Sequence, residues 1–256
     1  MLTNLQLEHI LDEKLNSKAI ADYAPNGLQV EGKREIRKII TGVTASLPLI
    51  EQAIAHNADA ILVHHGYFWK SENPCIRGMK GKRIKQLLVN DINLFGYHLP
   101  LDIHAELGNN AQLANMIGGQ NLRGLEESPN SIPMMCELAQ PISATELKQK
   151  LETALQRNVT LCDEFITDFP HKMIKTVGIC SGGGQGYIDL AAAKGCDAFI
   201  SGEISEQTTH SAREQGIYYF ACGHHATERD GIKALGEWLA EHYAVDVHFI
   251  DIDNPA

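Results

Sequence analysis

The sequence lacks several features that would each place it in a class of protein. Its six cysteines form no CxxC pair, and we expect them to be reduced residues of a cytoplasmic protein. The first residues show no basic start followed by an apolar block and a cleavage site, so we expect no secretory signal. No apolar run reaches the roughly 18 residues that a membrane span requires, and we therefore expect no membrane anchor.

Positive charge is also scarce. The 256 residues include 22 Lys and Arg against 32 Asp and Glu, for a net charge of −10 at pH 7. A chain with this balance offers no basic surface to a polyanionic backbone, so nonspecific nucleic-acid binding is not expected. Aromatic residues make up only 6%, while 44% of residues are hydrophobic. This composition is typical of tightly packed α/β layers with one large core or two smaller ones.

Two predicted helices, one in each half of the chain, repeat one pattern. Thr3 is the expected cap of the first helix, and Ser143 and Glu146 are expected to form a capping box at the start of the second. Each helix places three leucines on one face, with the same offset for every pair, namely Leu7, Leu11 and Leu15 in the first and Leu147, Leu151 and Leu155 in the second.

Two strand–helix–strand segments repeat in the same order. Asp59 precedes the second strand of the first segment, and Asp197 holds the equivalent place in the other; Ile92 and Ile217 correspond in the strands that follow. Chance similarity between βαβ segments is the alternative, but three registers in one order favour duplication. We predict an α/β fold of two similar tandem domains, residues 1–125 and 126–256, with helices flanking each sheet.

Two adjacent histidines, His64 and His65, end a predicted buried strand. Successive side chains of a strand point to opposite faces, so the two imidazoles cannot both line one core. At the carboxyl end, where the chain turns at Gly66, both can reach a crevice. Ligand sites of open α/β sheets lie at such strand ends.

The strand that follows in each half also ends in possible metal ligands. His98 precedes Asp102 by four residues, and His224, which is followed by His225, precedes Glu228 by four. This spacing puts both side chains on one face of a helical turn. If the halves face each other, the strand ends meet in the cleft between them, where they suit a pair of divalent transition metals. The alternative is a buried polar cluster.

Three other features of the sequence indicate a binding site less strongly. The glycine-rich segment 180–187 could hold a phosphate with its backbone amides, or it could be a tight turn with room for packing. Glu203, at the strand end equivalent to His65, either faces the same cleft or caps a helix. Asn26 and Gly27 indicate a turn before a strand and nothing more.

Six motifs, in the order NGLQVEG, VHHGYFW, YHLPLD, GNNAQLA, SGGG and GHHATE, give the chain a family resemblance. It resembles the GTP cyclohydrolase I type 2 homologues, also called Nif-three-like proteins, and most of all their short bacterial YbgI type. The resemblance spans essentially the whole chain. It implies two related α/β domains, a ring-shaped homohexamer and a centre of two divalent metal ions per subunit.

Carried over motif by motif, the resemblance implies five metal ligands, which are His64, His65, Asp102, His224 and Glu228. His98 and His225 are not ligands in the family pattern, so they are expected to orient ligands or carry protons beside the metals. Histidine and carboxylate ligands suit iron, manganese, zinc, cobalt or nickel.

Two functions are compatible with these residues. The first is a metal-dependent hydrolase of GTP cyclohydrolase type that acts on a purine nucleotide or a related heterocycle, with Glu228, His98 and His225 as catalytic groups. The second is a metal-binding scaffold or regulatory interaction protein without turnover. The expected metal ligands are equally compatible with the hydrolase and with the scaffold.

Overall fold

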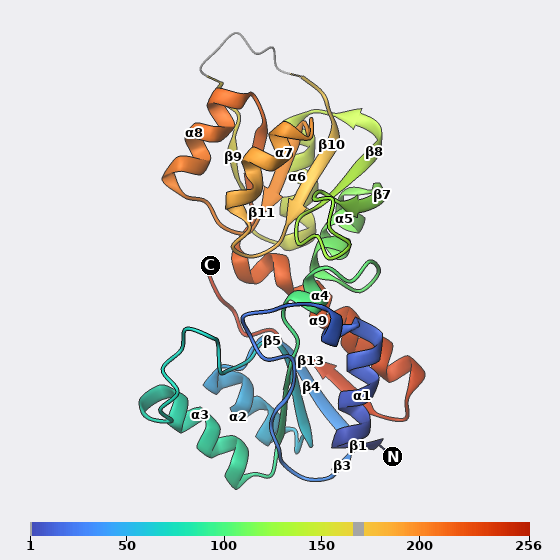
Figure 1. Cartoon of the computed structure of the whole chain (residues 1–256), viewed down its shortest axis with the longest axis vertical. Helices are drawn as coiled ribbons and strands as arrows, with labels where there is room; N and C mark the ends of the chain where they lie inside the picture. Colours follow the sequence, from blue (N-terminus) through green and yellow to red (C-terminus); the bar gives the residue numbers. More distant parts are fainter. Residues whose placement is uncertain (1, 166–171) are drawn as a thin grey trace. The chain divides into compact units, whose positions relative to one another are not determined.

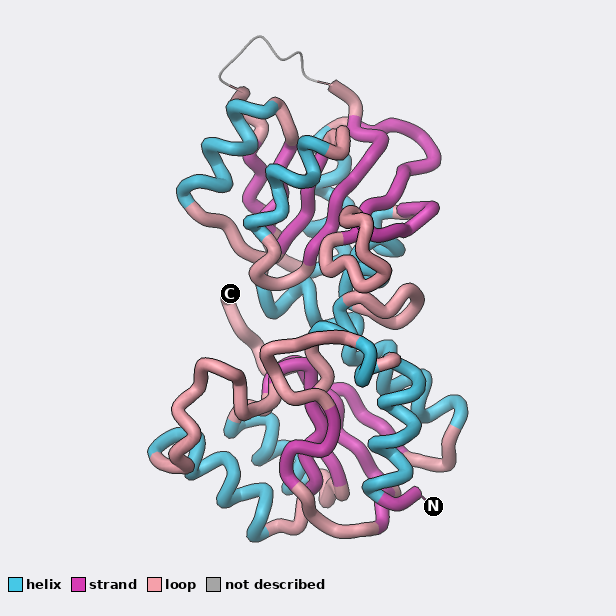
Figure 2. The backbone as a smooth tube through the Cα atoms, in the orientation of Figure 1, coloured by secondary structure: helices cyan, strands magenta, loops and turns pink. Residues whose placement is uncertain are grey.

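The computed structural model describes residues 2–165 and 172–256. By its contacts the chain forms two compact units. Unit 1 comprises Met1–Leu101 and Arg229–Asp253, and unit 2 comprises Asp102–Glu228 and Asn254–Ala256. In each unit helices flank a sheet (Figures 1 and 2), which confirms the predicted α/β class.

A sheet of five described strands forms the centre of unit 1, in the order β13-β4-β5-β6-β2. Its strands are β2 (Gly27–Val30), β4 (Lys38–Thr44), β5 (Ala60–His65), β6 (Asn93–Gly96) and β13 (Asp246–Phe249). The strands β13, β4, β5 and β6 are parallel, and β2 pairs antiparallel with β6. A parallel strand covered on both faces needs an apolar sequence, and β5 is accordingly buried up to His64.

Helices cover both faces of this sheet, with α2 and α3 on one side and α1 and α9 on the other (Figure 1). Their bounds are α1 (Asn4–Leu15), α2 (Leu47–Ala55), α3 (Gly78–Val89) and α9 (His224–His242), of which α9 begins in unit 2. The smaller elements are β1 (Leu2–Thr3), η1 (Ser17–Ala19), β3 (Glu35–Ile36) and α4 (Leu99–Asp102). The strands β1 and β3 pair with each other.

Unit 2 is built around six described strands in the order β7-β8-β10-β11-β12-β9. They are β7 (Gly119–Gly124), β8 (Met134–Ile142), β9 (Thr160–Cys162), β10 (Ile174–Cys180), β11 (Ala198–Ser201) and β12 (Tyr218–Ala221). The central strands β10, β11 and β12 are parallel, and the other three pair antiparallel. The helices are α5 (Asn109–Ile117), α6 (Ala144–Leu155), η2 (Gln185–Tyr187), α7 (Ile188–Ala193) and α8 (Glu206–Gln215).

The division by contacts differs from the sequence division into 1–125 and 126–256. The helix α5 and the strand β7 precede residue 125 but belong to unit 2, where β7 pairs with β8. Most of α9 and all of β13 return to unit 1, where β13 extends the sheet beside β4. Strand pairing between segments distant in the sequence therefore sets the units, and composition alone does not reveal it.

The central strands of the two units share one register. Ile39 of β4 lies opposite Ala60 of β5, and their equivalents in the repeat, Val177 of β10 and Ala198 of β11, lie opposite each other. On the following strands, Ala60 lies opposite Asn93 and Ala198 opposite Tyr218. The repeat that the sequence predicts is thus present residue by residue in the sheets.

The aspartates that mark this repeat have the same structural role. The Asp59 carboxylate accepts hydrogen bonds from the backbone N–H groups of Arg37 and Lys38, at 2.7 and 2.9 Å. The Asp197 carboxylate accepts hydrogen bonds from the backbone N–H groups of residues 175 and 176, both at 2.9 Å. Each aspartate therefore ties the start of one strand to the start of the next.

The repeated helices are also confirmed. The six leucines of their inner faces are at most 2% exposed. Thr3 accepts from Gln6 N at 3.2 Å, and Ser143 accepts from Glu146 N at 3.1 Å. The reciprocal bond that completes a capping box is present at Thr3, where the Gln6 side chain accepts from Thr3 N at 2.9 Å. The box predicted for Ser143 and Glu146 is not complete, because only the bond from Glu146 N to the Ser143 side chain is formed.

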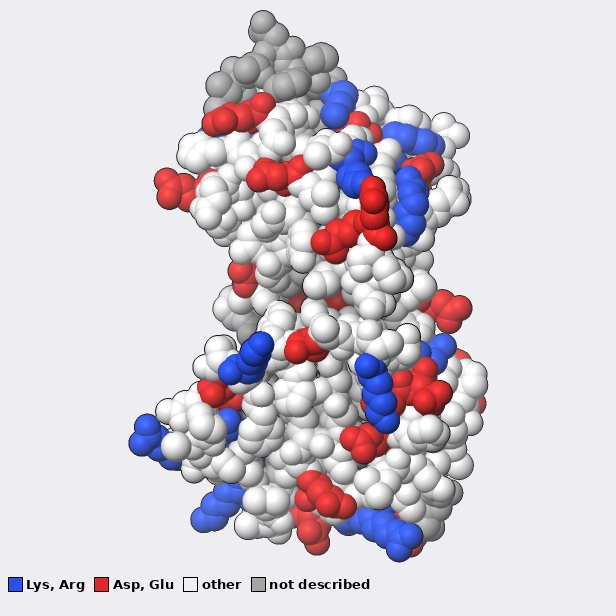
Figure 3. Space-filling view, in the orientation of Figure 1, with Lys and Arg blue, Asp and Glu red and all other residues white. Residues whose placement is uncertain are grey.

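The described part of the chain contains no helix that is long and apolar enough to cross a membrane. On the face of each unit drawn in Figure 3, Lys and Arg side chains stand singly or in small groups among Asp and Glu side chains. That face therefore presents no broad basic patch.

Candidate metal centre

Three imidazoles gather at the carboxyl ends of β5 and β6 in unit 1. His64 and His65 end β5, and His98 follows β6. One ring nitrogen from each of the three lies within 4.8 Å of those of the other two. The ring centroids are 4.5 Å apart for His64 and His65 and 5.1 Å apart for His64 and His98. The predicted strand-end cluster of histidines is therefore present, and it includes His98.

Each of these imidazoles is held through its Nδ1 atom. The partner of His64 is the Tyr97 carbonyl at 3.0 Å, and that of His65 is Thr44 Oγ1 at 3.3 Å. His98 Nδ1 lies 3.0 Å from Asp22 Oδ1. Histidines that ligate a metal are commonly oriented in this way, through the nitrogen that does not face the ion. In each of the three rings, Nδ1 is thus the nitrogen that the protein holds, and Nε2 is the nitrogen on the other side of the ring.

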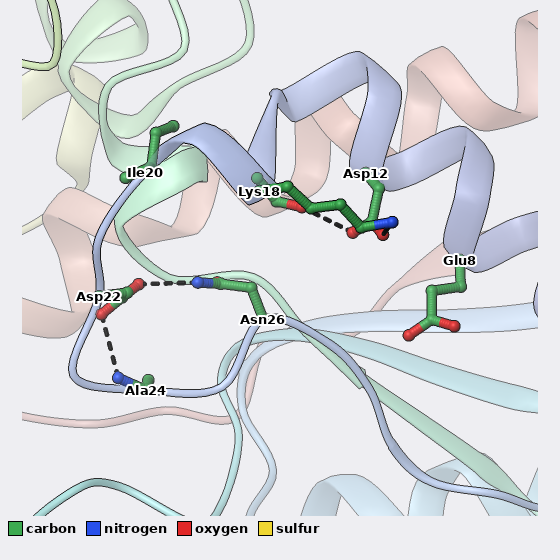
Figure 4. Close-up of a pocket in the computed structure, with 8 residues that line it drawn as sticks. Glu8, Asp12, Lys18, Ile20, Asp22, Ala24 and Asn26 are labelled. Carbon is green, nitrogen blue, oxygen red and sulfur yellow. Dashed lines mark hydrogen bonds and ion pairs between the residues drawn. The ribbon is translucent and has the colours of Figure 1, made fainter.

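The pair formed by Asp22 and His98 is buried, with side chains 3% and 8% exposed. Asp22 also accepts from Leu99 N at 2.9 Å. Figure 4 shows two further bonds that it accepts, from Asn26 Nδ2 at 3.0 Å and from Ala24 N at 3.1 Å. Burial by itself would raise the pKa of Asp22, but the hydrogen bond and charge of His98 hold it well below its ordinary value of 3.8. Asp22 is thus an ionised acceptor that fixes the His98 ring.

Sequence reasoning missed Asp22 and treated Asn26 only as part of a turn. Besides bonding Asp22, Asn26 accepts from His98 N at 2.8 Å. The available signal was an aspartate followed by an Asn-Gly turn, because such side chains often bond nearby backbone. Its partner His98 is 76 residues away in the sequence, and only folding brings the two together.

A polar cavity of about 430 Å³ lies along the same loop, as Figure 4 shows. It is lined by Glu8, Asp12, Ser17, Lys18, Ile20, Asp22, Ala24 and Asn26. Lys18 pairs with Asp12 at 3.2 Å, and Glu8 Oε1 accepts from Leu28 N at 2.8 Å. These charged lining groups are thus engaged in holding α1 against the loop and β2.

In unit 2, His224 stands between two carboxylates. Its Nε2 lies 3.3 Å from Glu228 Oε2, and its Nδ1 lies 2.7 Å from Glu203 Oε1. The hydrogen bond with Glu228 raises the pKa of His224, burial opposes the rise, and Glu203 adds to it, giving a pKa of about 9. The predicted helical turn from His224 to Glu228 is present at the start of α9. This arrangement stabilises positive charge at the imidazole.

Glu203 therefore orients His224, while its Oε2 atom accepts from Gln185 Nε2 at 3.2 Å. Of the two interpretations of Glu203, the structure favours the one that places it beside the candidate ligands. The capping box of α8 is formed by Ser205 and Thr208.

The glycine-rich turn after β10 packs against these ligands. Gly182 has a φ of +58°, and a Cβ atom there would clash with Glu228 Oε1 and approach His224 Nε2 to 3.0 Å. The helix α7 begins only at Ile188, after the 3-10 turn η2. This geometry supports the tight-turn interpretation, because the glycine is needed for close approach to Glu228.

Asp102 is also held within unit 2. It is 6% exposed, and its Oδ1 accepts from Asn109 Nδ2 at 2.7 Å and from Ser181 Oγ at 3.1 Å. His225 is 8% exposed, and its backbone N donates to Ala256 O at 3.2 Å. Among the described residues, His225 belongs to no group whose ligand atoms are close enough to share an ion.

The donor chemistry fits divalent metal ions. The candidate donors within unit 1 are imidazoles held through Nδ1, and those within unit 2 are an imidazole and buried carboxylates, each with hydrogen-bond partners that fix it. Nitrogen and carboxylate donors of this kind suit first-row transition metals, and partners behind the ligands are usual at such sites.

Comparison with known proteins gives a consistent result. The sequence model of the family described as Duf34/NIF3 (NGG1p interacting factor 3) matches residues 3–255. A Haemophilus influenzae protein named GTP cyclohydrolase 1 type 2 homolog is 66% identical over 255 residues, which cover 100% of both chains. An Escherichia coli protein of the same name is 55% identical over 255 residues, again covering 100% of both.

Two solved structures are similar over their full length. The protein ybgI, described as of unknown function, has a TM-score of 0.94 and 55% identity, with 100% of both chains covered. The protein TTHA1606 of Thermus thermophilus has a TM-score of 0.87 and 29% identity, also with 100% of both chains covered.

Proposed function

This chain belongs to the Duf34/NIF3 family, and we propose that it is a dinuclear metal-dependent hydrolase of GTP cyclohydrolase type. Its substrate is a purine nucleotide or a related heterocycle. The observation that carries the proposal is the cluster of His64, His65 and His98, each held through Nδ1. The name shared by the Haemophilus influenzae and Escherichia coli relatives supports the cyclohydrolase type.

The proposed ligands to two divalent ions are His64 and His65 from unit 1 and Asp102, His224 and Glu228 from unit 2. Support comes from their types and from the partners that fix each of them. Iron, manganese, zinc, cobalt and nickel all suit such a set. The chain crosses between the units at Leu101–Asp102 and again at Glu228–Arg229, so two of the five ligands lie at the crossing points.

Divalent ions, when bound, would polarise the substrate and lower the pKa of water. The residues of the chain supply orientation and proton transfer. Glu228 is the proposed base, and Gly182 packs against the carboxyl that takes the proton. His98 presents Nε2 while Asp22 holds Nδ1, which makes His98 a second proton carrier. We assign His225 a supporting proton-transfer role, as the third catalytic group of the proposal.

The competing function is a metal-binding scaffold without turnover. It requires the ligands but gives no reason for a buried Asp22–His98 pair, since His98 is outside the proposed ligand set. That pair favours the enzyme.

Metal binding is tested first, by elemental analysis of purified protein beside His64→Ala and Glu228→Ala variants. We expect close to two divalent ions per chain and a loss of metal in both variants. A content below one ion per chain, unchanged by either substitution, would contradict the proposed centre.

Turnover is tested by incubating metal-loaded protein with a panel of purine nucleotides and measuring release of formate and ring-opened product. Glu228→Gln keeps the shape of the side chain and removes its charge, so it is the matched control. Product formation that does not exceed that of Glu228→Gln would favour the scaffold.

We also propose that the chain assembles into a homohexamer in the cytoplasm, as the family resemblance implies. Light scattering of the purified protein should give six times the monomer mass. A monomeric mass at micromolar concentration would contradict this part of the proposal.

A further inference from the structure

Two aromatic side chains of unit 1, Tyr23 and Trp69, lie against the imidazole cluster. Their ring centroids are 5.6 Å apart. Trp69 is 4.9 Å from His98 and 5.8 Å from His65, and Tyr23 is 5.0 Å from His98. Tyr23 is 54% exposed and Trp69 is half-buried. Accessible apolar patches rimmed by polar groups often mark ligand-binding sites, and aromatic side chains are common in the lining of such sites.

Hydrogen bonds hold the Trp69 ring and the backbone of both residues in place. The Trp69 indole N–H donates to Gly66 O at 3.2 Å, and Glu72 Oε2 accepts from Trp69 N at 3.3 Å. Tyr23 N donates to Asp22 Oδ1 at 2.7 Å, while Lys70 N donates to Tyr23 O at 2.8 Å. The last bond ties the two loops to each other. Rigid aromatic rings bind a ligand with little loss of conformational entropy.

The loop that carries Trp69 is strained. Phe68 has a φ of +65°, a left-handed conformation that is a genuine outlier for a bulky side chain. Glu72 Oε2 accepts from Phe68 N at 2.8 Å, and the Lys80 ammonium lies 3.2 Å from Glu72 and 4.7 Å from the Phe68 ring centroid. Strain of this kind costs about 1–3 kcal/mol and concentrates at ligand sites. Here the strained residue immediately precedes Trp69.

We propose that Tyr23 and Trp69 form a stacking subsite for the planar heteroaromatic ring of a ligand, beside the His65 and His98 imidazoles. The subsite deepens the proposed function and rests on it for the reaction, but binding of the ring requires only unit 1. Neither Tyr23 nor Trp69 carries a charged donor of the kind that binds a phosphate group. The subsite therefore takes the base of a nucleotide and not its phosphates.

The test is equilibrium dialysis of metal-loaded protein with guanosine, with ribose 5-phosphate as the probe that lacks the ring. We expect saturable guanosine binding that Trp69→Leu weakens by about 5- to 150-fold, the range measured for stacking of one base. Trp69→Phe keeps an aromatic face and should weaken binding less than Trp69→Leu does. Trp238→Phe replaces the other tryptophan of the chain and is the matched control, with no change expected.

A second readout is the fluorescence of Trp69 in the Trp238→Phe background, which guanosine should quench and ribose 5-phosphate should not. Tyr23→Ala should weaken binding independently, so the proposal stays testable if Trp69→Leu fails to fold. Equal guanosine affinity in wild type and in a folded Trp69→Leu or Tyr23→Ala variant would overturn the subsite. So would choline binding as tightly as guanosine, because that result identifies a cation site.

The failure of this subsite and the failure of the hydrolase give different results. Stacking of guanosine without turnover of any nucleotide would support the subsite and contradict the proposed hydrolase activity. Turnover that is lost in Glu228→Gln, with guanosine affinity unchanged in Trp69→Leu, would contradict the subsite and support the hydrolase.

Discussion

Unit 1 and unit 2 can be compared strand by strand, because their central strands share one register. Where β5 ends in His64 and His65, the residues that the same register places after β11 are Gly202 and Glu203. Unit 1 therefore ends its strand in imidazoles, and unit 2 ends it in a carboxylate that orients His224.

The framework and the candidate site are therefore specified by separate residues. Asp59 and Asp197 hold the amino ends of the strands in the same way in both units. The carboxyl ends, where ligands bind in such sheets, have changed without disturbing that register. Matched substitutions in the two units can therefore show how far the equivalence extends.

The largest expected effect is on the repeated helices. Leu11→Ala in α1 and Leu151→Ala in α6 remove side chains with no exposed surface, and each should cost about 2–5 kcal/mol in free energy of unfolding. Urea denaturation followed by circular dichroism measures the loss. Leu5→Ala, at a side chain 62% exposed on α1, is the control with little effect. A loss of stability in only one of the two variants would contradict the equivalence of the two helices.

The next effect concerns the two carboxylate–histidine pairs. Asp22→Asn in unit 1 and Glu203→Gln in unit 2 each remove the charge that orients an imidazole. Loss of such a partner typically lowers metal affinity about 10- to 100-fold, which competition with a chelator measures. His224 is a proposed ligand and His98 is not, so we expect the larger loss in Glu203→Gln. The reverse order would make His98 a ligand.

The paired aspartates come third. Asp59→Ala and Asp197→Ala each leave two backbone donors without their carboxylate, at a cost of about 1–3 kcal/mol per site. Burial would raise the pKa of Asp59, but Lys33 and the backbone donors lower it below 3.8. Its stabilising contribution is thus present above pH 4 and is lost as the pH falls through the lowered pKa. The difference in free energy of unfolding between the wild-type protein and Asp59→Ala should therefore shrink in acid. A difference that stays constant down to pH 2 would contradict this expectation.

The smallest effect is at the helix caps. Thr3→Ala and Ser143→Ala each remove an acceptor for a backbone N–H and should cost about 0.5–2 kcal/mol. Thr3 also belongs to a complete capping box, so its substitution should cost more. Thermal unfolding shows which of the two variants loses more stability. Thr3→Ser and Ser143→Thr, which keep the acceptor, serve as controls.

Much of the fold follows from local pattern. The leucine spacing of both helices and the apolar runs of β4, β5, β10 and β11 depend on the helical and strand periodicities, which the sequence shows directly. The edges of the sheets do not follow in this way. β13 pairs with β4 although Asp246 and Lys38 lie near opposite ends of the chain, because strand pairing has no fixed sequence distance.

The repeat, the strand-end histidines and the carboxylates that follow His98 and His224 by four residues could be recognised from the sequence. The bond between Asp22 and His98, the packing of Gly182 on Glu228, and the place of Tyr23 and Trp69 beside His98 are seen only in the folded chain. These partners are far apart along the chain. Periodicity and spacing specify neighbours within one element, whereas these contacts join separate segments that come together only when each unit folds.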